Sequence, residues 1–232
     1  MSESSSPVSL SDQKQAFIDF MLECNVLRFG DFTTKSGRKT PYFVNTGHYD
    51  NGHRLRVLGE FYAHAIMQQI GPEFDVIYGP AYKGIPLAVA AGSALDRLYG
   101  LTRGVTFNRK EAKDHGEGGV LVGHPIVNGS RIVIIDDVVT AGTSVAESVE
   151  ILTQAAKVNL TALIVSVDRQ ERGNGELSAL QEVEKRHGLK TGAIVSLDDI
   201  LACVKARSHS GIPMVDADTE ARIVKYRKQY GV

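Results

Sequence analysis

The sequence has 232 residues, 43% of them hydrophobic, and its formal net charge at pH 7 is -1. This length suits one well-buried α/β domain with a small appendage, and a near-neutral chain without a long basic block argues against nucleic acid as a partner. No apolar stretch approaches membrane-spanning length, and the N-terminal MSESSSPVSLS lacks the basic and apolar regions of a secretion signal, so we expect a cytoplasmic protein that does not bind membranes.

The first quarter of the chain predicts a disordered tail over residues 1–11 followed by a helix and a hairpin. Residues 12–25 place apolar side chains at helical spacing, and two short extended segments, 28–34 and 40–45, flank the turn-forming KSGRK. We expect residues 12–50, together with the C-terminal segment, to form a small hood. Cys24 and Cys203 are far apart and match no metal or redox spacing, which indicates buried thiols.

From Phe74 onward, short apolar strands alternate with helical segments. The predicted strands are 74–79, 104–110, 131–137, 161–168 and 192–197, and the predicted helices are 51–70, 85–99, 145–156, 177–187 and 218–230. This alternation predicts an α/β fold with a mostly parallel central sheet flanked by helices. In such sheets ligands gather beyond the carboxyl ends of the strands, so the segments that follow the strands are the candidates for chemistry.

The most informative of these segments is VIIDDVVTAGTS, residues 133–144. A buried strand delivers Asp136 and Asp137 to its end, and a turn rich in Thr, Gly and Ser then starts a helix whose first N–H groups can hold a phosphate. The two carboxylates suit sugar hydroxyls or a hydrated divalent cation. A phosphorylated sugar matches all these groups. The competing interpretation is a phosphoacceptor receiver domain, but that fold carries its acidic pair near the N-terminus.

A second strand end carries GPAYKG, residues 79–84. Its two glycines permit close backbone approach, and Lys83 adds a positive charge, so this loop could cradle a second phosphate group. On its own the segment would be read as an ordinary strand-to-helix turn. Beside the first motif it predicts two phosphate sites at neighbouring strand ends.

The third segment, NRKEAKDHGEGG at residues 108–119, predicts a solvent-exposed loop. Its basic side chains are balanced by acidic ones, so a plain solvated loop is a serious alternative. The functional interpretation requires closure of the loop over a bound diphosphate, with exclusion of water. His115, taken alone, is as consistent with a surface polar group as with a catalytic one.

The fourth segment is VDRQE, residues 167–171, in which Arg169 follows another strand. The guanidinium fork of arginine suits a carboxylate ligand. A structural salt bridge is the alternative.

In combination, VIIDDVVTAGTS, KSGRKTPYF, GPAYKGIPLA, FNRKEAKDHGEGG and DRQE resemble the orotate phosphoribosyltransferases, a branch of the type I phosphoribosyltransferases, from about residue 12 to the C-terminus. The resemblance implies a single phosphoribosyltransferase domain over residues 12–232. It also implies transfer of a phosphoribosyl group from 5-phosphoribosyl 1-diphosphate to orotate with Mg²⁺, giving orotidine 5'-phosphate and diphosphate. In this family a homodimer shares its active sites across the interface.

The resemblance also assigns roles to residues. For the phosphoribosyl diphosphate it implies Lys35, Tyr82, Lys83, Arg109, Lys110, Lys113, His115, Asp136, Asp137, Val138, Val139, Thr140, Ala141, Gly142, Thr143 and Ser144; for orotate it implies Phe43, Val44, Thr140 and Arg169. It gives Lys83, Arg109, Lys113 and His115 catalytic roles, and it places Mg²⁺ mainly on the substrate with Asp136 and Asp137 nearby. The family often has a second phenylalanine where this chain has Val44, which reduces the stacking area.

Two other functions are weighed against this one. A phosphoribosyltransferase for a purine or uracil is disfavoured by the hood and by DRQE. A regulator that binds the sugar diphosphate without turnover would normally add a basic nucleic-acid element, and none is visible in this sequence.

Overall fold

The computed structural model describes residues 10–34, 37–113, 119–140, 142–173, 175–209, 211 and 214–232. The chain separates into two compact units. One unit contains the described residues up to Tyr49 together with Val195–Gly231, and the other contains Asp50–Ile194 and Val232. In the part of the chain that is described, no helix is long and apolar enough to cross a membrane.

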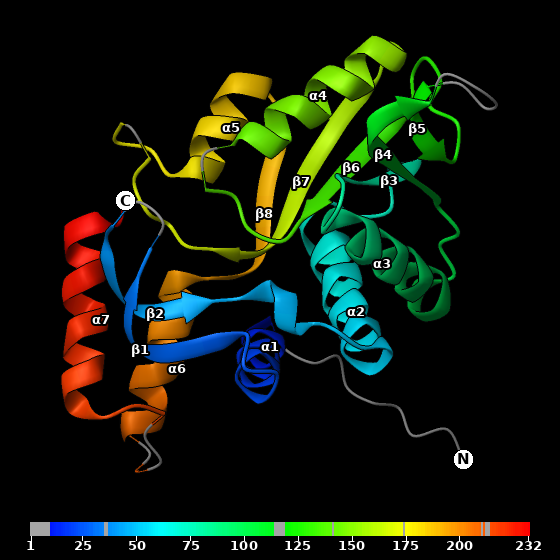
Figure 1. Ribbon diagram of the computed structural model, residues 1–232. Coiled ribbons are helices and arrows are strands. Elements are labelled where there is room, and N and C mark those ends of the chain that lie inside the picture. The colour runs from blue at the N-terminus through cyan, green and yellow to red at the C-terminus, as the bar shows by residue number, and fades with distance from the viewer. Residues whose placement is uncertain are drawn as a thin grey trace, which may run out of the picture. The chain divides into compact units, whose positions relative to one another are not determined.

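The larger unit is built on a six-stranded sheet with the order β5-β4-β3-β6-β7-β8 (Figure 1). Its strands are β3 (Val76–Gly79), β4 (Gly104–Lys113), β5 (Gly119–Gly123), β6 (Arg131–Asp136), β7 (Asn159–Asp168) and β8 (Lys190–Ser196). β3 pairs in parallel with both β4 and β6, and β6 pairs in parallel with β7, whereas β4 and β5 are antiparallel. This arrangement confirms the predicted α/β fold with a mostly parallel sheet.

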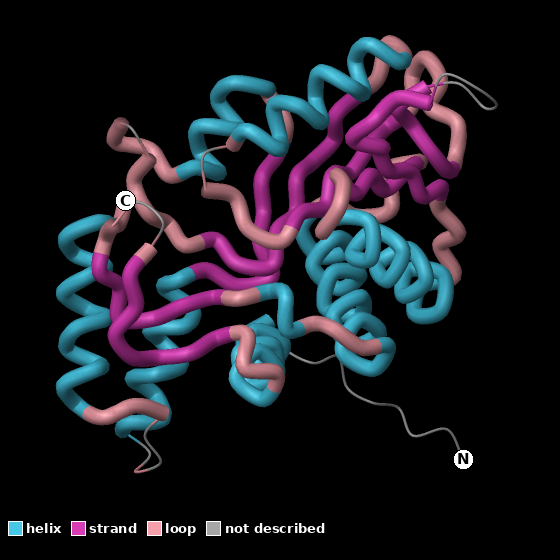
Figure 2. Tube along the Cα trace, viewed as in Figure 1, coloured by secondary structure: helices cyan, strands magenta, loops and turns pink. Residues whose placement is uncertain are grey.

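Helices cover both faces of this sheet (Figure 2). They are α2 (Gly52–Gln69), α3 (Gly84–Tyr99), α4 (Thr143–Ala155) and α5 (Ala179–His187). α4 and α5 cover one face, where Val145, Leu152 and Leu180 pack against Tyr78 and Ile134 of the sheet. α2 and α3 lie on the other face. The strands read as continuous apolar runs because both of their faces are buried.

The smaller unit joins the two ends of the chain. It contains α1 (Leu10–Glu23), β1 (Leu27–Thr33), β2 (Lys39–Val44), the short helix η1 (Thr46–His48), α6 (Leu197–His209) and α7 (Ala217–Tyr230). β1 and β2 form the predicted antiparallel hairpin. The ring of Tyr226 on α7 packs edge-on against Tyr42 on β2, with 5.7 Å between centroids, and Lys14 on α1 bonds Asp199 on α6 at 2.8 Å. Cys24 and Cys203 are buried free thiols, as predicted.

The structure corrects one prediction and refines another. Residues 111–113, predicted as loop beyond the strand 104–110, are the last residues of β4, because β5 pairs with this strand and extends it; residues 114–118 lie outside the described residues. α1 begins at Leu10, two residues earlier than predicted. Residues 1–9 of the predicted tail are not among the described residues.

Candidate active site at four adjacent strand ends

The four segments singled out in the sequence follow four strands that are neighbours in the sheet. GPAYKG follows β3, DVVTAGTS follows β6, RQE follows β7, and the basic segment 109–113 is the end of β4, in the spatial order β4-β3-β6-β7. Because these four strands are parallel, their carboxyl ends meet at one edge of the sheet. The chain also reverses its direction of winding between β3 and β6, which is the position where open α/β sheets bind ligands.

The turn after β6 encloses a cavity of about 260 Å³. The cavity is lined by Asp136, Val138, Val139, Thr140, Gly142, Thr143, Ser144 and Val145. Gly142 has a φ of 70°, in the left-handed region that glycine adopts without steric cost. Ala141 is outside the described residues. Hydroxyl groups and the N–H groups of a helix start thus line one small hollow, which suits a phosphate group.

Two helices that start at this edge, α3 and α4, have no side-chain caps. The N-cap residue of α3 is Lys83 and that of α4 is Gly142. Neither provides a side-chain acceptor for the N–H groups of the first turn. By contrast, α2, α5 and α7 are capped by Asn51, Ser178 and Asp216. Since uncapped first-turn N–H groups favour an anion, the starts of α3 and α4 can each receive a phosphate.

The two adjacent carboxylates are almost fully buried, at 7% exposure each, and each oxygen has a defined neighbour. Asp136 accepts hydrogen bonds from the Asp137 backbone N–H at 2.9 Å and from the Ser144 hydroxyl at 3.2 Å. Asp137 accepts from the Val138 backbone N–H at 2.8 Å with one oxygen and from Lys83 Nζ at 2.9 Å with the other. The pair is held rigidly beside the cavity.

The electrostatics of the acidic pair differ from those of free aspartates. Burial raises the pKa of Asp136 to about 6, and repulsion from the charge of Asp137 adds to the shift. The backbone N–H of Asp137 and the hydroxyl of Ser144 oppose it. A buried carboxylate with a raised pKa favours partners that bring hydroxyl groups or positive charge.

The loop after β3 meets the turn after β6 through one ion pair. Lys83 Nζ lies 2.9 Å from Asp137, with the lysine side chain 64% exposed and the aspartate only 10%. An ion pair with so exposed an amine contributes little to stability. Tyr82 is 68% exposed, and Lys110 Nζ lies over its ring in a cation–π contact, 5.5 Å from the ring centroid. Two of the predicted phosphate segments and part of the third are therefore in contact.

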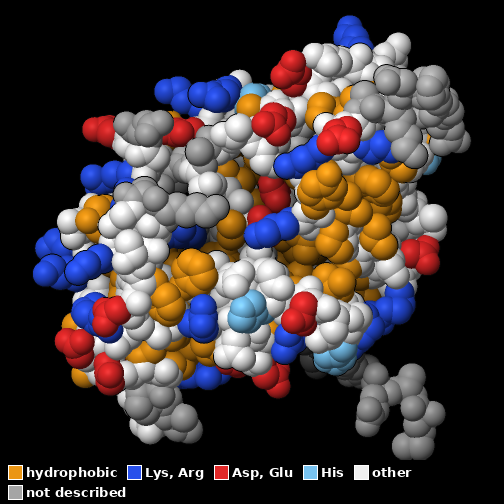
Figure 3. Space-filling model, viewed as in Figure 1, with side chains coloured by type: hydrophobic (Ala, Val, Ile, Leu, Met, Phe, Trp, Pro, Cys, Tyr) orange, Lys and Arg blue, Asp and Glu red, His pale blue; other side chains and the backbone are white. Residues whose placement is uncertain are grey.

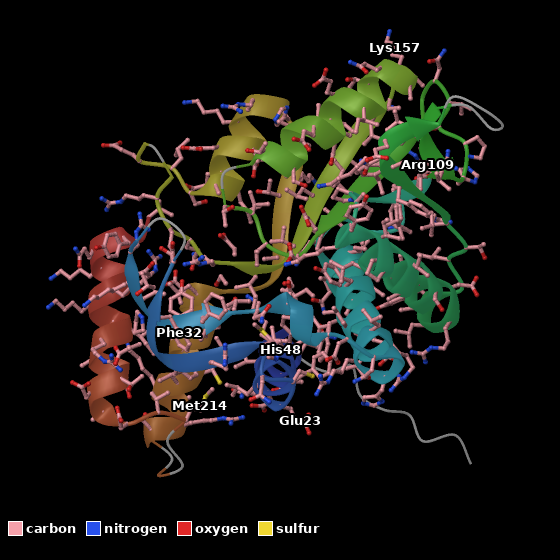
Figure 4. The ribbon with its side chains drawn as sticks, viewed as in Figure 1. Glu23, Phe32, His48, Arg109, Lys157 and Met214 are labelled. Carbon is pink, nitrogen blue, oxygen red and sulfur yellow. The ribbon has the colours of Figure 1, made fainter. Side chains whose placement is uncertain are left out.

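Arg109 lies on β4, where Figure 4 labels it. Its side chain is half-buried, and its Nη1 atom is buried without a hydrogen-bond partner among the described residues. A buried guanidinium nitrogen without a hydrogen-bond partner is energetically costly. Lys113 is the last residue of β4, and the position of its side chain is not described. His115 lies outside the described residues.

The remaining predicted residues have structural partners of their own. Arg169, after β7, forms an ion pair with Glu171 at 2.5 Å, which is the salt bridge given as the alternative. In the smaller unit, Phe43 stacks on Phe32 with 5.4 Å between centroids and Val44 is half-buried at the end of β2. Lys35 is outside the described residues.

Two residues that the sequence did not indicate hold the backbone of the acidic pair by hydrogen bonds to its carbonyl groups. Tyr62, fully buried on α2, donates its hydroxyl to the carbonyl of Asp136 at 2.8 Å, and Ser166 on β7 donates its hydroxyl to the carbonyl of Asp137 at 2.7 Å. Both side chains look like ordinary packing in the sequence. Only the tertiary structure brings these donors to the strand end.

The donors present fit a magnesium ion that arrives with its ligand. No group of three His, Cys, Asp or Glu side chains within the described ranges is placed to hold a metal ion by itself. Mg²⁺ is usually bound through one or two carboxylates, with water and substrate phosphates completing the shell. Asp136 and Asp137 supply that number of carboxylates beside the phosphate cavity.

Comparisons with known proteins agree on one family. The family described as phosphoribosyl transferase domain matches residues 46–178. The chain is 48% identical to an orotate phosphoribosyltransferase of Clostridium acetobutylicum over 96% of this chain and 100% of that protein, and 47% identical to one of Actinobacillus pleuropneumoniae serotype 5b over 96% and 100%. A crystal structure of a Francisella tularensis orotate phosphoribosyltransferase superposes with a TM-score of 0.81 at 33% identity, covering 94% of this chain and 100% of that chain.

Proposed function

This chain belongs to the orotate phosphoribosyltransferase family, and on that premise we propose that its strand-end pocket transfers the phosphoribosyl group of 5-phosphoribosyl 1-diphosphate to orotate. The products are orotidine 5'-phosphate and diphosphate, in pyrimidine biosynthesis. One observation carries the assignment to this pocket. Lys83 of one phosphate loop touches Asp137 of the other at 2.9 Å, beside the cavity that the second loop encloses.

The substrate is placed by matching its groups to the pocket. The 5-phosphate occupies the cavity at the start of α4, where Thr140, Thr143 and Ser144 offer hydroxyl and N–H groups. The ribose hydroxyls donate to Asp136 and Asp137. The diphosphate lies at the start of α3, where Lys83 leaves Asp137 to bind it. Tyr82, Val138, Val139, Ala141 and Gly142 contribute through the backbone that shapes these two loops.

In the reaction, the bond between the anomeric carbon and the diphosphate oxygen breaks while a ring nitrogen of orotate forms the new bond. Positive charge develops on the ribose and negative charge on the leaving diphosphate. Lys83 stabilises that negative charge, and no protein nucleophile is required. Magnesium, when bound with the substrate beside Asp136 and Asp137, supplies further positive charge for the leaving group.

The cationic segment after Asn108 completes the site in this proposal. Arg109, Lys110, Lys113 and His115 close over the diphosphate of a neighbouring subunit and exclude water, which protects the activated sugar from hydrolysis. The unsatisfied Nη1 of Arg109 supports a partner outside its own chain. For orotate we propose Thr140 and Arg169, with Phe43 and Val44 from the hood, and for the diphosphate donor also Lys35.

A homodimer is supported by an apolar groove between α2 and α3. The groove measures about 410 Å³, and Val89 within it is 51% exposed. The hydrophobic side chains over α3 form a continuous orange area in Figure 3. An apolar surface of this kind favours burial against a second protein surface, and a second copy of this chain is the partner that shared active sites require. We also propose a cytoplasmic location and one catalytic domain over residues 12–232.

The deciding experiment measures diphosphate release from 5-phosphoribosyl 1-diphosphate with orotate, uracil, adenine and hypoxanthine in turn, with and without Mg²⁺. Of these combinations, we expect diphosphate release only when orotate and Mg²⁺ are both present. Faster release with a purine or uracil would assign the protein to another branch. Binding of the sugar diphosphate without any product would identify a regulator.

A further inference from the structure

Asn108 connects the diphosphate loop to two neighbouring strands. Its side-chain oxygen Oδ1 accepts a hydrogen bond from the Ala81 backbone N–H at 2.8 Å and another from the Tyr78 hydroxyl at 2.9 Å. Because a backbone N–H can only donate, the amide group must present its oxygen to the loop. Asn108 also pairs with Leu121 in the last regular step of the β4–β5 ladder before its register shifts. The side chain therefore projects from a strand that is itself fixed.

The loop that Asn108 contacts, residues 79–84, is a tight turn held by few other hydrogen bonds. Pro80 has no N–H group, so Ala81 supplies the first backbone donor after β3. The Gly84 N–H donates to the Pro80 carbonyl at 2.9 Å, and a Cβ on Gly79 would lie 2.1 Å from the Gly84 carbonyl oxygen. The two ends of the turn are closed onto each other. The hydrogen bond from Ala81 to Asn108 fixes the part that lies between them.

The second partner of Asn108 links it to the phosphate-binding helix. Tyr78 is fully buried, and burial raises the pKa of its hydroxyl to about 12, so the group stays protonated and must find an acceptor. Its ring belongs to the same core as Val145 in the first turn of α4. Asn108 thus ties the diphosphate loop to the base of the phosphate helix.

We propose that Asn108 is a positioning residue that sets the place of Lys83 for the leaving diphosphate. Lys83 is two residues beyond Ala81 in the same loop, and its Nζ lies 2.9 Å from Asp137, so the hydrogen bond to Asn108 anchors the loop that carries this amine. In this proposal Asn108 acts through the loop and not through contact with the substrate. The inference rests on the proposed function, because it assigns the loop to the diphosphate.

The test is the variant Asn108→Ala, assayed with each substrate varied in turn. Removing the acceptor takes away the partner of the Tyr78 hydroxyl and of the partly buried Ala81 N–H, so we expect the KM for 5-phosphoribosyl 1-diphosphate to rise about tenfold or more while the KM for orotate stays within about twofold. Asn108→Asp keeps an acceptor oxygen and should recover part of the loss. In a Lys83→Ala background, Asn108→Ala should cause little further loss, since both changes act on one group.

Asn128→Ala is the matched control, because Asn128 Oδ1 also accepts one backbone N–H, that of Lys157 at 2.8 Å, at an exposed turn outside the pocket. Equal changes in both KM values, or additive losses with Lys83→Ala, would overturn the proposal. If Asn108→Ala does not fold, Asn108→Gln moves the acceptor by one methylene and takes its place. If the wild type releases no diphosphate, the proposed function fails. Titration of wild type and variant with the sugar diphosphate then still decides the role of Asn108. Equal affinities refute that role, and weaker binding by the variant supports it.

Discussion

Asp136 has an environment that differs strongly from that of a free aspartate. Its pKa is raised to about 6 from an ordinary value of 3.8, mainly by burial. A folded-state pKa above the unfolded value means that the protonated form stabilises the fold below about pH 4. This contribution is lost as the pH rises through about 6. At neutral pH the ligand-free protein therefore carries a buried charge that opposes folding.

Replacing this carboxylate should accordingly stabilise the ligand-free protein in a pH-dependent manner. For Asp136→Asn we expect the free energy of unfolding to exceed that of wild type by on the order of 1–3 kcal/mol above pH 7, with the difference shrinking toward zero at pH 4. Urea unfolding across this pH range measures it. Glu176→Gln, at an exposed position, is the control and should show no such trend. A difference that is constant with pH would contradict the burial argument.

Lys113 carries the second prediction at this scale. If its cation stabilises the leaving diphosphate as an oxyanion-hole donor stabilises an oxyanion, Lys113→Ala should lower kcat by roughly 10²- to 10³-fold. Steady-state assay of orotate consumption provides the measurement. A loss below about threefold, with unchanged substrate binding, would remove Lys113 from the catalytic group.

At the level of elements, the contact between α2 and α3 depends on Gly59. A Cβ at this position would lie 2.4 Å from the backbone carbonyl oxygen of Ala90 on α3, and a backbone atom cannot move aside without shifting the helix. We expect Gly59→Ala to lower the free energy of unfolding by about 1–3 kcal/mol through overpacking. Gly52→Ala, in the same helix with nothing within 4 Å of the new Cβ, should change it by less than about 0.5 kcal/mol. Equal effects in the two variants would show that helix propensity, not close packing, governs this pair.

At the level of the whole molecule, shared active sites predict complementation between inactive variants. A dimer of one Lys83→Ala chain and one Lys113→Ala chain has one site with both defects and one site with neither. Random co-assembly makes half of the dimers mixed, so the mixture should recover about a quarter of wild-type activity. Co-expression of two differently tagged chains provides the sample. Activity no higher than that of the separate variants would exclude sites built from two chains.

The dimer itself can be tested through the α2–α3 groove. Val89→Glu places a charge on this apolar surface and should shift the protein toward monomer and reduce activity. Val127→Glu is the control, since Val127 is 60% exposed on the loop before β6 and outside the groove. Sedimentation at several concentrations measures the shift. An unchanged mass for both variants would place any dimer contact elsewhere.

Much of this protein could be predicted from its sequence because the governing signals are local. The apolar runs before Gly79 and Asp136 and the helical spacing after Ser144 depend on residues near each other in the chain, and they predicted β3, β6, α4 and the mostly parallel sheet. β5 and the bounds of α6 were not predicted. The motif residues predicted the family for the same reason. The loop prediction for residues 111–113 was wrong because β4 is extended by pairing with β5, and such pairing leaves no trace in a polar sequence.

The tertiary structure alone decided which groups meet. Strand order brings Lys83 to Asp137 although 54 residues separate them, and it brings the hydroxyl of Tyr62 to the carbonyl of Asp136 across 74 residues. Asn108 reads as one more polar side chain until the sheet places it beside Ala81. Hydrogen bonds and pKa shifts depend on distance and burial in space, so the composition of a motif determines its chemistry, while the sheet determines how its parts are joined.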